Sequence, residues 1–120
     1  HRVLANSESV GALVEAQGVP AGKVFVLPNF LEDEAFAPMS PAGRAAALAE
    51  LGVPPGATVV GLVARLSGEK RVDLLVRAFA RVSADFPAAH LVVAGDGGER
   101  PALEALAREL GVTRRTHFAG

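Results

Sequence analysis

The sequence contains no cysteine, tryptophan or tyrosine, and its formal net charge is only −1. The lack of cysteine excludes disulfide bonds, thiolate metal sites and a cysteine nucleophile, and it fits a cytoplasmic protein. Nucleic-acid-binding domains usually carry a strongly basic face, often interleaved with aromatic residues. The sequence has neither feature, so we expect no nucleic-acid partner.

Long apolar runs are also missing. A membrane-spanning helix needs about 18 consecutive apolar residues, and the runs in this chain are far shorter. The first residues, HRVLANSES, lack an initial Met and a charged-then-apolar leader, so we expect no signal peptide and interpret them as the interior of a longer protein. Half of the residues are nevertheless hydrophobic, which is enough for a folded core.

The N-terminal part of the chain combines a short apolar run, a helical pattern and a second apolar run. Ser7 is expected to cap the helix, whose apolar residues recur at helical spacing. The segment 23–27, KVFVL, is predicted to be a strand, and the aperiodic segment 30–39 is predicted to be a connector. A second helix is expected to begin at Ser40 and Pro41, because proline is favoured at the first helical position.

From Thr58 onward, strand-like and helix-like patterns alternate. The runs 58–64 (TVVGLVA) and 90–95 (HLVVAG) are continuously apolar, which is typical of parallel strands buried on both faces. Apolar residues from Val72 to Phe86 recur at helical spacing and predict an amphipathic helix whose phenylalanines belong to the core. A further helix near 103–110 and a last strand in THFAG complete the pattern. It predicts an α/β fold with a Rossmann-like parallel sheet and flanking helices.

Two cations, Arg65 and Lys70, fall in the loop between the first of these strands and its helix. Ligands of open α/β sheets bind beyond the carboxyl ends of the strands, where a helix N-terminus also points its amides at an anion. A guanidinium and an ammonium suit a pyrophosphate, and Ser67 helps to keep the loop compact. The same spacing also allows a plain surface turn, in which Arg65 pairs with Glu69 or Asp73 and Lys70 is solvated.

Other known phosphate-binding motifs match this sequence poorly. A Walker A loop requires Gly-Lys followed by Ser or Thr, whereas Lys70 is separated from Gly68 and followed by Arg71. The stretch GDGGER offers Gly95 and Gly97 but has Arg100 where the third glycine of a dinucleotide fingerprint would stand. Neither motif is therefore predicted.

The order of five segments is more informative than any one of them: VLANSES, VFVLPNFLEDEAFAP, VVGLVARLSGEKRVDLLVRAFARV, LVVAGDGGERPALEALARELG and THFAG. Together they resemble the retaining nucleotide-sugar glycosyltransferases of family 4, also called group 1. The resemblance spans nearly the whole chain and implies the GT-B fold, in which two Rossmann-like lobes flank a cleft. It implies that residues 1–38 form the tail of the acceptor-side lobe and the crossover. Residues 39–120 would form the first half of the donor-binding lobe.

The resemblance also implies an activity, namely glycosyl transfer from a nucleoside-diphosphate sugar with retention of configuration. Arg65 and Lys70 would be catalytic, because they would stabilise the charge that grows on the leaving diphosphate. No metal is expected, since the two cations and the helix end take its place, and no cofactor is expected, since the sugar nucleotide is a substrate. The donor site would also include four small residues, Gly61, Ser67, Gly95 and Gly97.

The implied partners are the sugar-nucleotide donor and a carbohydrate or lipid-linked acceptor. The full-length protein is expected in the cytoplasm, with a peripheral membrane contact allowed. The residues single out no particular sugar, base or acceptor.

The chain departs from the family pattern at two positions and lacks two motifs. Phe30 follows Asn29 where the family commonly has glycine, and Arg71 stands where a glycine usually follows the Glu-Lys pair. The family's acidic motif is expected beyond Gly120, and its acceptor-side glycine loop before His1. We therefore expect this stretch alone to be inactive and, with an open apolar sheet edge, marginally stable.

Two other classes of function remain open at this point. One is a sugar-nucleotide epimerase or a glycan phosphorylase on a similar two-lobe scaffold, and the other is a nucleotide-binding fragment without chemistry. The three histidines share no metal-ligand spacing, and His117, within a predicted strand, is expected to be a core or edge residue rather than a base. Asp96 is expected to brace its own turn, and the acidic stretch 32–34 is expected to be solvated.

Overall fold

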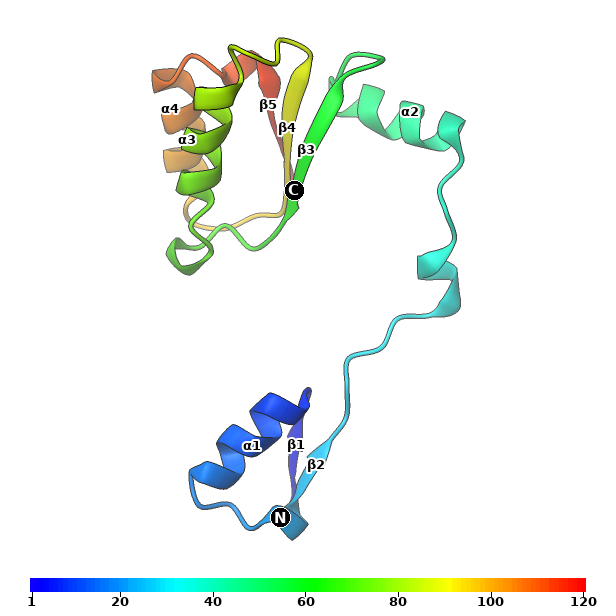
Figure 1. The fold of residues 1–120 in the computed structure, drawn as a ribbon, viewed down its shortest axis with the longest axis vertical. Helices are drawn as coiled ribbons and strands as arrows, with labels where there is room; N and C mark the ends of the chain where they lie inside the picture. The colour runs from blue at the N-terminus through cyan, green and yellow to red at the C-terminus, as the bar shows by residue number, and fades with distance from the viewer. The chain divides into compact units, whose positions relative to one another are not determined.

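The computed structural model describes residues 1–120, except for the side chain of Glu34. The chain divides into two compact units, His1–Pro38 and Met39–Gly120 (Figure 1). The boundary between the units lies within the segment 30–39, which the sequence predicts to be a connector. The assignment of the two units to an acceptor-side and a donor-side lobe stays a prediction.

The first unit is a small β–α–β motif. Its strands β1 (Val3–Ala5) and β2 (Val24–Val26) are parallel, and α1 (Glu8–Ala16) connects them. The predicted cap is confirmed, because the hydroxyl of Ser7 accepts a hydrogen bond from the amide of Val10 at 3.2 Å. One short 3₁₀ turn, Ala21–Lys23, lies between α1 and β2, and a second, Asp33–Phe36, follows β2.

The second unit carries a three-stranded parallel sheet in the order β3-β4-β5 (Figure 1). The α/β class with parallel sheets flanked by helices is therefore confirmed. The hydroxyl of Ser40 caps the first helix of the unit, as predicted, by accepting from the amide of Gly43 at 3.1 Å. The elements are α2 (Pro41–Glu50), β3 (Thr58–Val63), α3 (Val72–Val82), β4 (Ala89–Ala94), α4 (Arg100–Glu109) and β5 (Thr116–Ala119).

The core of this unit lies between the sheet and the helices α3 and α4, which cover one face of the sheet (Figure 1). Alternate side chains of β4 point into this core, because successive residues of a strand face opposite sides. The fully buried residues include Val76 of α3, Leu91 and Val93 of β4, and Leu66 of the loop after β3. Leu66 thus ties the candidate anion loop to the core.

The prediction that the first strand of this sheet is buried on both faces is wrong for β3. Its residues are half-buried or exposed, and the side chain of Val63 is 87% exposed. β3 is an edge strand of the sheet, whereas β4 lies between two strands and is buried along most of its length. The apolar sequence of β3 would allow burial on both faces, but as an edge strand β3 has a neighbouring strand on one side only.

The helix predicted to extend to Phe86 ends earlier. α3 ends at Val82, and Phe86 is 62% exposed, so the assignment of Phe86 to the core is wrong, whereas Phe79 is buried as predicted. The hydroxyl of Ser83 donates to the carbonyl of Ala80 at 2.9 Å, which stabilises the last turn. Phe86 lies in the turn that leads to β4.

Candidate anion site at the carboxyl edge of the sheet

The loop after β3 places Arg65 and Lys70 at the carboxyl end of that strand, and both side chains are exposed. A short 3₁₀ turn, Gly68–Lys70, carries the lysine and is closed by a hydrogen bond from the amide of Lys70 to the carbonyl of Ser67 at 2.9 Å. α3 begins directly after this turn, at Val72. The strand–loop–helix arrangement predicted from the sequence is therefore present.

Arg65 forms an ion pair with Glu69, with 3.0 Å between Nη2 and Oε1. This is one of the two pairings that the sequence allowed as an alternative to an anion site. The two side chains are 72% and 61% exposed, so solvent screens their attraction. The guanidinium of Arg65 is therefore already within reach of one anionic group, and breaking such an exposed ion pair costs little free energy.

Arg71 adopts a left-handed backbone conformation, with φ of 47° and ψ of 41°. Its guanidinium forms two hydrogen bonds to the carboxylate of Asp73, at 3.1 and 3.2 Å. These hydrogen bonds, helped by the charge of Arg71, hold the pKa of Asp73 below its usual value. Asp73 therefore pairs with Arg71 rather than with Arg65, and its carboxylate lies in the first turn of α3, where the helix dipole favours negative charge.

The loops after β3 and β4 are joined through the main chain of Leu66. Its amide donates to the carbonyl of Asp96 at 2.9 Å, and its carbonyl accepts from the amide of Glu99 at 3.1 Å. The carboxylate of Asp96 also accepts from the amide of Gly97 at 2.8 Å, which confirms that Asp96 braces its own turn. The two loops therefore form one continuous surface at the carboxyl edge of the sheet.

Gly95 and Gly97 permit this close approach. A Cβ on Gly95 would collide with the carbonyl oxygen of Ala64, and a Cβ on Gly97 would collide with that of Leu66. Gly95 also has a φ of 140°, which side chains disfavour. Both glycines lie at the predicted edge, where the structure shows a packing reason for them that the sequence pattern did not reveal.

The two remaining predicted donor-site residues, Ser67 and Gly61, lie in different elements, one in the loop and one in β3. Ser67 is half-buried in the loop, and its hydroxyl lies 3.5 Å from the Oε1 atom of Glu69. Gly61 lies within β3, opposite Val92, and no atom would contact a Cβ at this position within 4 Å. Gly61 is thus in the strand rather than in the loop, and its role in binding stays a prediction.

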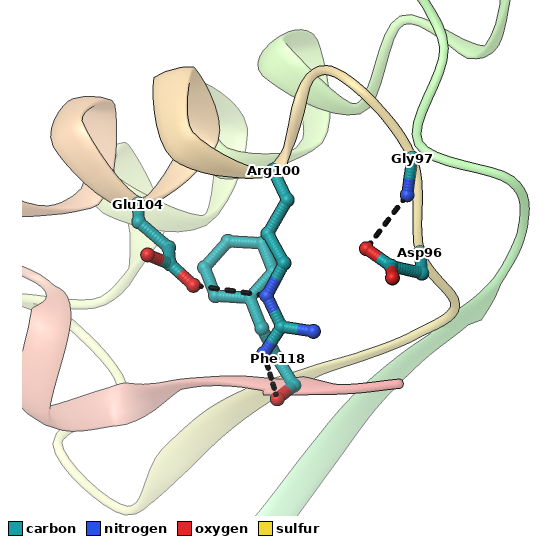
Figure 2. A network of polar contacts seen from close by, with 5 residues as sticks. All are labelled: Asp96, Gly97, Arg100, Glu104 and Phe118. Atoms are coloured by element: carbon teal, nitrogen blue, oxygen red, sulfur yellow. Dashed lines mark hydrogen bonds and ion pairs between the residues drawn. The ribbon is translucent and has the colours of Figure 1, made fainter.

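A polar network at the end of β5 was not found by sequence reasoning. Arg100, the first residue of α4, donates from Nε to Oε1 of Glu104 at 3.0 Å and from Nη2 to the carbonyl of Phe118 at 3.1 Å (Figure 2). The side chain of Arg100 is 32% exposed. The i,i+4 spacing of Arg100 and Glu104 was visible in the sequence, but the carbonyl partner was not.

His90 and His117 form a second contact that the sequence did not predict. Their Nδ1 and Nε2 atoms are 2.8 Å apart, and the rings are stacked with centroids separated by 5.1 Å. Burial lowers the pKa of His90, and the nearby His117 and Arg115 lower it further. The rings lie on the sheet face opposite α3 and α4, so this pair belongs to packing rather than to the anion loops.

Some kinds of site are not seen in the part of the chain that the structure describes. No three His, Asp or Glu side chains of this part gather closely enough to hold a metal ion. None of its helices combines the length and apolar character needed to cross a membrane. A broad hollow of about 900 Å³ is lined by residues of α3 and by Leu110, and none of the predicted site residues lines it.

Comparison of this chain with known protein families identifies the class of protein to which it belongs. Residues 44–120 match the family described as "Glycosyl transferases group 1". Because the match covers more than half of the chain, the chain belongs to this family. The predicted family relationship is confirmed at this level.

Particular members of this class resemble the chain over nearly all of its residues. The D-inositol 3-phosphate glycosyltransferases of Nocardia farcinica and Kribbella flavida are 38% and 39% identical over 98% of this chain, which covers 27% and 29% of their sequences. The crystal structure of Anabaena Alr3699/HepE in complex with UDP and glucose has a TM-score of 0.81 and 27% identity, with 98% of this chain and 32% of that chain covered. The chain thus spans about a quarter to a third of the relatives it matches, and the structural similarity to GT-B glycosyltransferases confirms the fold class.

Proposed function

We propose that this chain supplies the donor-diphosphate site of a glycosyltransferase that uses a nucleoside-diphosphate sugar. The observation that carries the proposal is the position of Arg65 and Lys70. Both cations face solvent on the loop at the carboxyl end of β3, directly before the N-terminus of α3. Parallel α/β sheets bind ligands at this edge, and a helix N-terminus adds a favourable field for an anion.

The ion pair between Arg65 and Glu69 is compatible with this role. An exposed pair contributes about 0–1 kcal/mol, whereas a diphosphate offers more charge and several acceptor oxygens to the same guanidinium. The donor would therefore displace the carboxylate of Glu69 from Arg65. Lys70, for which no ion pair is seen among the described side chains, would bind a second phosphate oxygen.

The chemistry proposed for the site is stabilisation of the leaving group. When the glycosidic bond to the diphosphate breaks, negative charge grows on the diphosphate oxygens, and preformed cations lower the energy of that state. We propose that the sugar passes to a hydroxyl group of a carbohydrate, polyol or lipid-linked acceptor with retention of configuration. The Anabaena relative was crystallised with UDP-glucose, which supports a UDP-sugar as the first donor to test.

Mutation of the full-length enzyme tests this proposal. Arg65→Ala and Lys70→Ala should each reduce the rate of glycosyl transfer by orders of magnitude, because each removes charge stabilisation from the transition state. Arg81→Ala serves as the matched control, since Arg81 is an exposed arginine on α3, away from the loop. Near-normal transfer by both loop variants would refute the proposed function.

A further inference from the structure

The loop after β3 and the first turn of α3 carry two acidic side chains, and each of them is paired with an arginine. Arg65 forms one hydrogen bond with Glu69, at 3.0 Å. Arg71 forms two hydrogen bonds with the carboxylate of Asp73, at 3.1 and 3.2 Å. The Asp73 side chain is 39% exposed, against 61% for Glu69. Because it is two-pronged and less exposed, the pair of Arg71 is harder for a ligand to open than the pair of Arg65.

Asp73 stands close to the candidate diphosphate site. It follows Lys70 by three residues, and since consecutive Cα atoms are about 3.8 Å apart, the two Cα atoms lie within about 11 Å of each other. Its carboxylate belongs to the first turn of α3, the end at which the helix dipole attracts an anion. An unpaired carboxylate there would stabilise the helix but repel a diphosphate bound at the same end. The site therefore benefits when the charge of Asp73 is neutralised.

Arg71 is placed for this neutralisation by an unusual main chain. Among the residues that the structure describes, it is the one non-glycine residue with a positive φ, of 47°. Glycine adopts such a conformation readily, whereas an arginine is strained by it. The amide of Arg71 donates to the carbonyl of Gly68 at 3.3 Å, and its carbonyl accepts from the amide of Leu74 at 3.0 Å. The hydrogen bonds seen for its side chain all go to Asp73, so this pairing is the compensation that the structure offers for the strain.

We propose that Arg71 is a positioning residue that neutralises Asp73 and so keeps the N-terminus of α3 free for the donor diphosphate. Arg71 acts through Asp73 and does not itself bind the donor. The inference rests on the proposed function and deepens it. It divides the cations of this region into two ligands of the diphosphate, Arg65 and Lys70, and one residue that masks a competing anion.

The consequence is a rescue that a direct contact would not show. Arg71→Gly exposes the charge of Asp73 while the main chain keeps its conformation, because glycine accepts a positive φ. Affinity for a diphosphate should therefore fall. Asp73→Asn in the same chain removes the exposed charge and should restore the affinity. If the guanidinium itself bound the donor, or if its loss distorted the loop, the second substitution would restore nothing.

The experiment is calorimetric titration of the full-length protein at about 20 mM salt, where charges are weakly screened. UDP, GDP and ADP are titrated first, and the one that binds most tightly is used for the variants. Arg71→Gly should weaken it about three- to tenfold, as expected for one exposed charge acting on a diphosphate through solvent. The double variant should bind within about twofold of the wild type, because the two removed charges cancel. Asp73→Asn alone should bind more tightly than the wild type.

Matched variants and salt complete the design. Arg81→Ala removes the same charge from the last turn of α3 and should leave the affinity nearly unchanged. Arg71→Lys keeps the charge without the two-pronged contact, so it should lose less affinity than Arg71→Gly. At about 0.5 M salt the loss in Arg71→Gly should shrink below about twofold, because screening removes the repulsion.

The outcomes separate the inference from the proposed function. Wild-type affinity in Arg71→Gly, or a loss that persists in the double variant or at high salt, overturns the role of Arg71. Arg65→Ala tests the diphosphate site itself and should weaken binding whether or not residues 71 and 73 are changed. Wild-type affinity in Arg65→Ala, or binding of none of the three nucleotides, refutes the proposed function instead.

Discussion

The main-chain amide of Leu66 donates to the carbonyl of Asp96 at 2.9 Å, and this hydrogen bond joins the loops after β3 and β4. The side chain of Leu66 is fully buried in the core at the same time. A loop that carries two exposed cations is therefore anchored by one residue to the core and to its neighbouring loop. Such support keeps a binding loop in position before its ligand arrives.

Gly95 tests this joined-loop arrangement. Gly95→Ala should lower the free energy of unfolding of the full-length protein by about 2 kcal/mol or more, because its Cβ collides with the carbonyl of Ala64 and its φ of 140° is disfavoured. Gly98→Ala is the matched control, since a Cβ there has no neighbour within 4 Å. Urea denaturation should show little change for Gly98→Ala. Equal effects of the two substitutions would contradict the packing argument.

Substitutions of Arg71 test whether the main chain of the same loop adopts its left-handed conformation. Arg71→Gly and Arg71→Ala both remove the ion pair to Asp73, so their difference reports the left-handed conformation at φ 47°. Glycine adopts this conformation freely, whereas alanine pays about 1 kcal/mol. The glycine variant should therefore unfold at higher urea concentration than the alanine variant. The reverse order would show that residue 71 does not hold this conformation in solution.

Glu69 tests the competition for Arg65. Glu69→Gln removes the carboxylate that pairs with the guanidinium at 3.0 Å and should tighten nucleoside-diphosphate binding by a factor of about two to five at low salt. The gain should shrink as ionic strength rises, because salt screens exposed charges. Weaker binding by Glu69→Gln in calorimetry would show that the carboxylate helps the donor instead of competing with it.

The lowered pKa of His90 should make the stability of the folded protein depend on pH. Burial, together with the charges of His117 and Arg115, lowers its pKa in the folded state below the ordinary value of 6.5. Between the two pKa values, His90 is protonated in the unfolded state but neutral in the folded state. The contribution of His90 to the free energy of unfolding is therefore fully present above pH 6.5, and it decreases as the pH falls towards the pKa of the folded state. No further loss from this group is expected once the pH lies below both values.

Unfolding by urea at about pH 7.5 and at about pH 5.5, on either side of the ordinary histidine value, measures this effect. The wild-type protein should lose more stability between the two pH values than His90→Gln, whose side chain does not titrate. The difference between the two proteins cancels the contributions of titratable groups that lie far from His90. Equal losses in both proteins would contradict the inferred pKa of His90.

The sequence predicted most elements and the loop that carries the cations, because capping residues and apolar periods are local signals. The caps at Ser7 and Ser40 and the order of strands and helices from Thr58 onward are confirmed. The predicted helix extended too far, to Phe86, since a helical spacing of apolar residues does not mark the end of the helix at Val82. The burial of β3 was also overestimated, because burial depends on what neighbours the strand has.

The contacts between distant segments were beyond sequence reasoning. The approach of Gly95 to Ala64, the pair His90–His117 and the bond from Arg100 to Phe118 all depend on how parallel strands are placed side by side. The register of β4 and β5 places His117 opposite Val92, two residues from His90 on the same face of the sheet, which brings the two rings together. No single-residue pattern in the sequence carries that information.

Calorimetric titration of the full-length protein with a nucleoside diphosphate tests the central claim most directly. Arg65→Ala and Lys70→Ala should each weaken binding at least about tenfold, because each removes a charged partner of the diphosphate, and the double variant should bind more weakly than either. Arg81→Ala should bind like the wild-type protein. Wild-type affinity in both loop variants would contradict the assignment of the diphosphate site to the loop after β3.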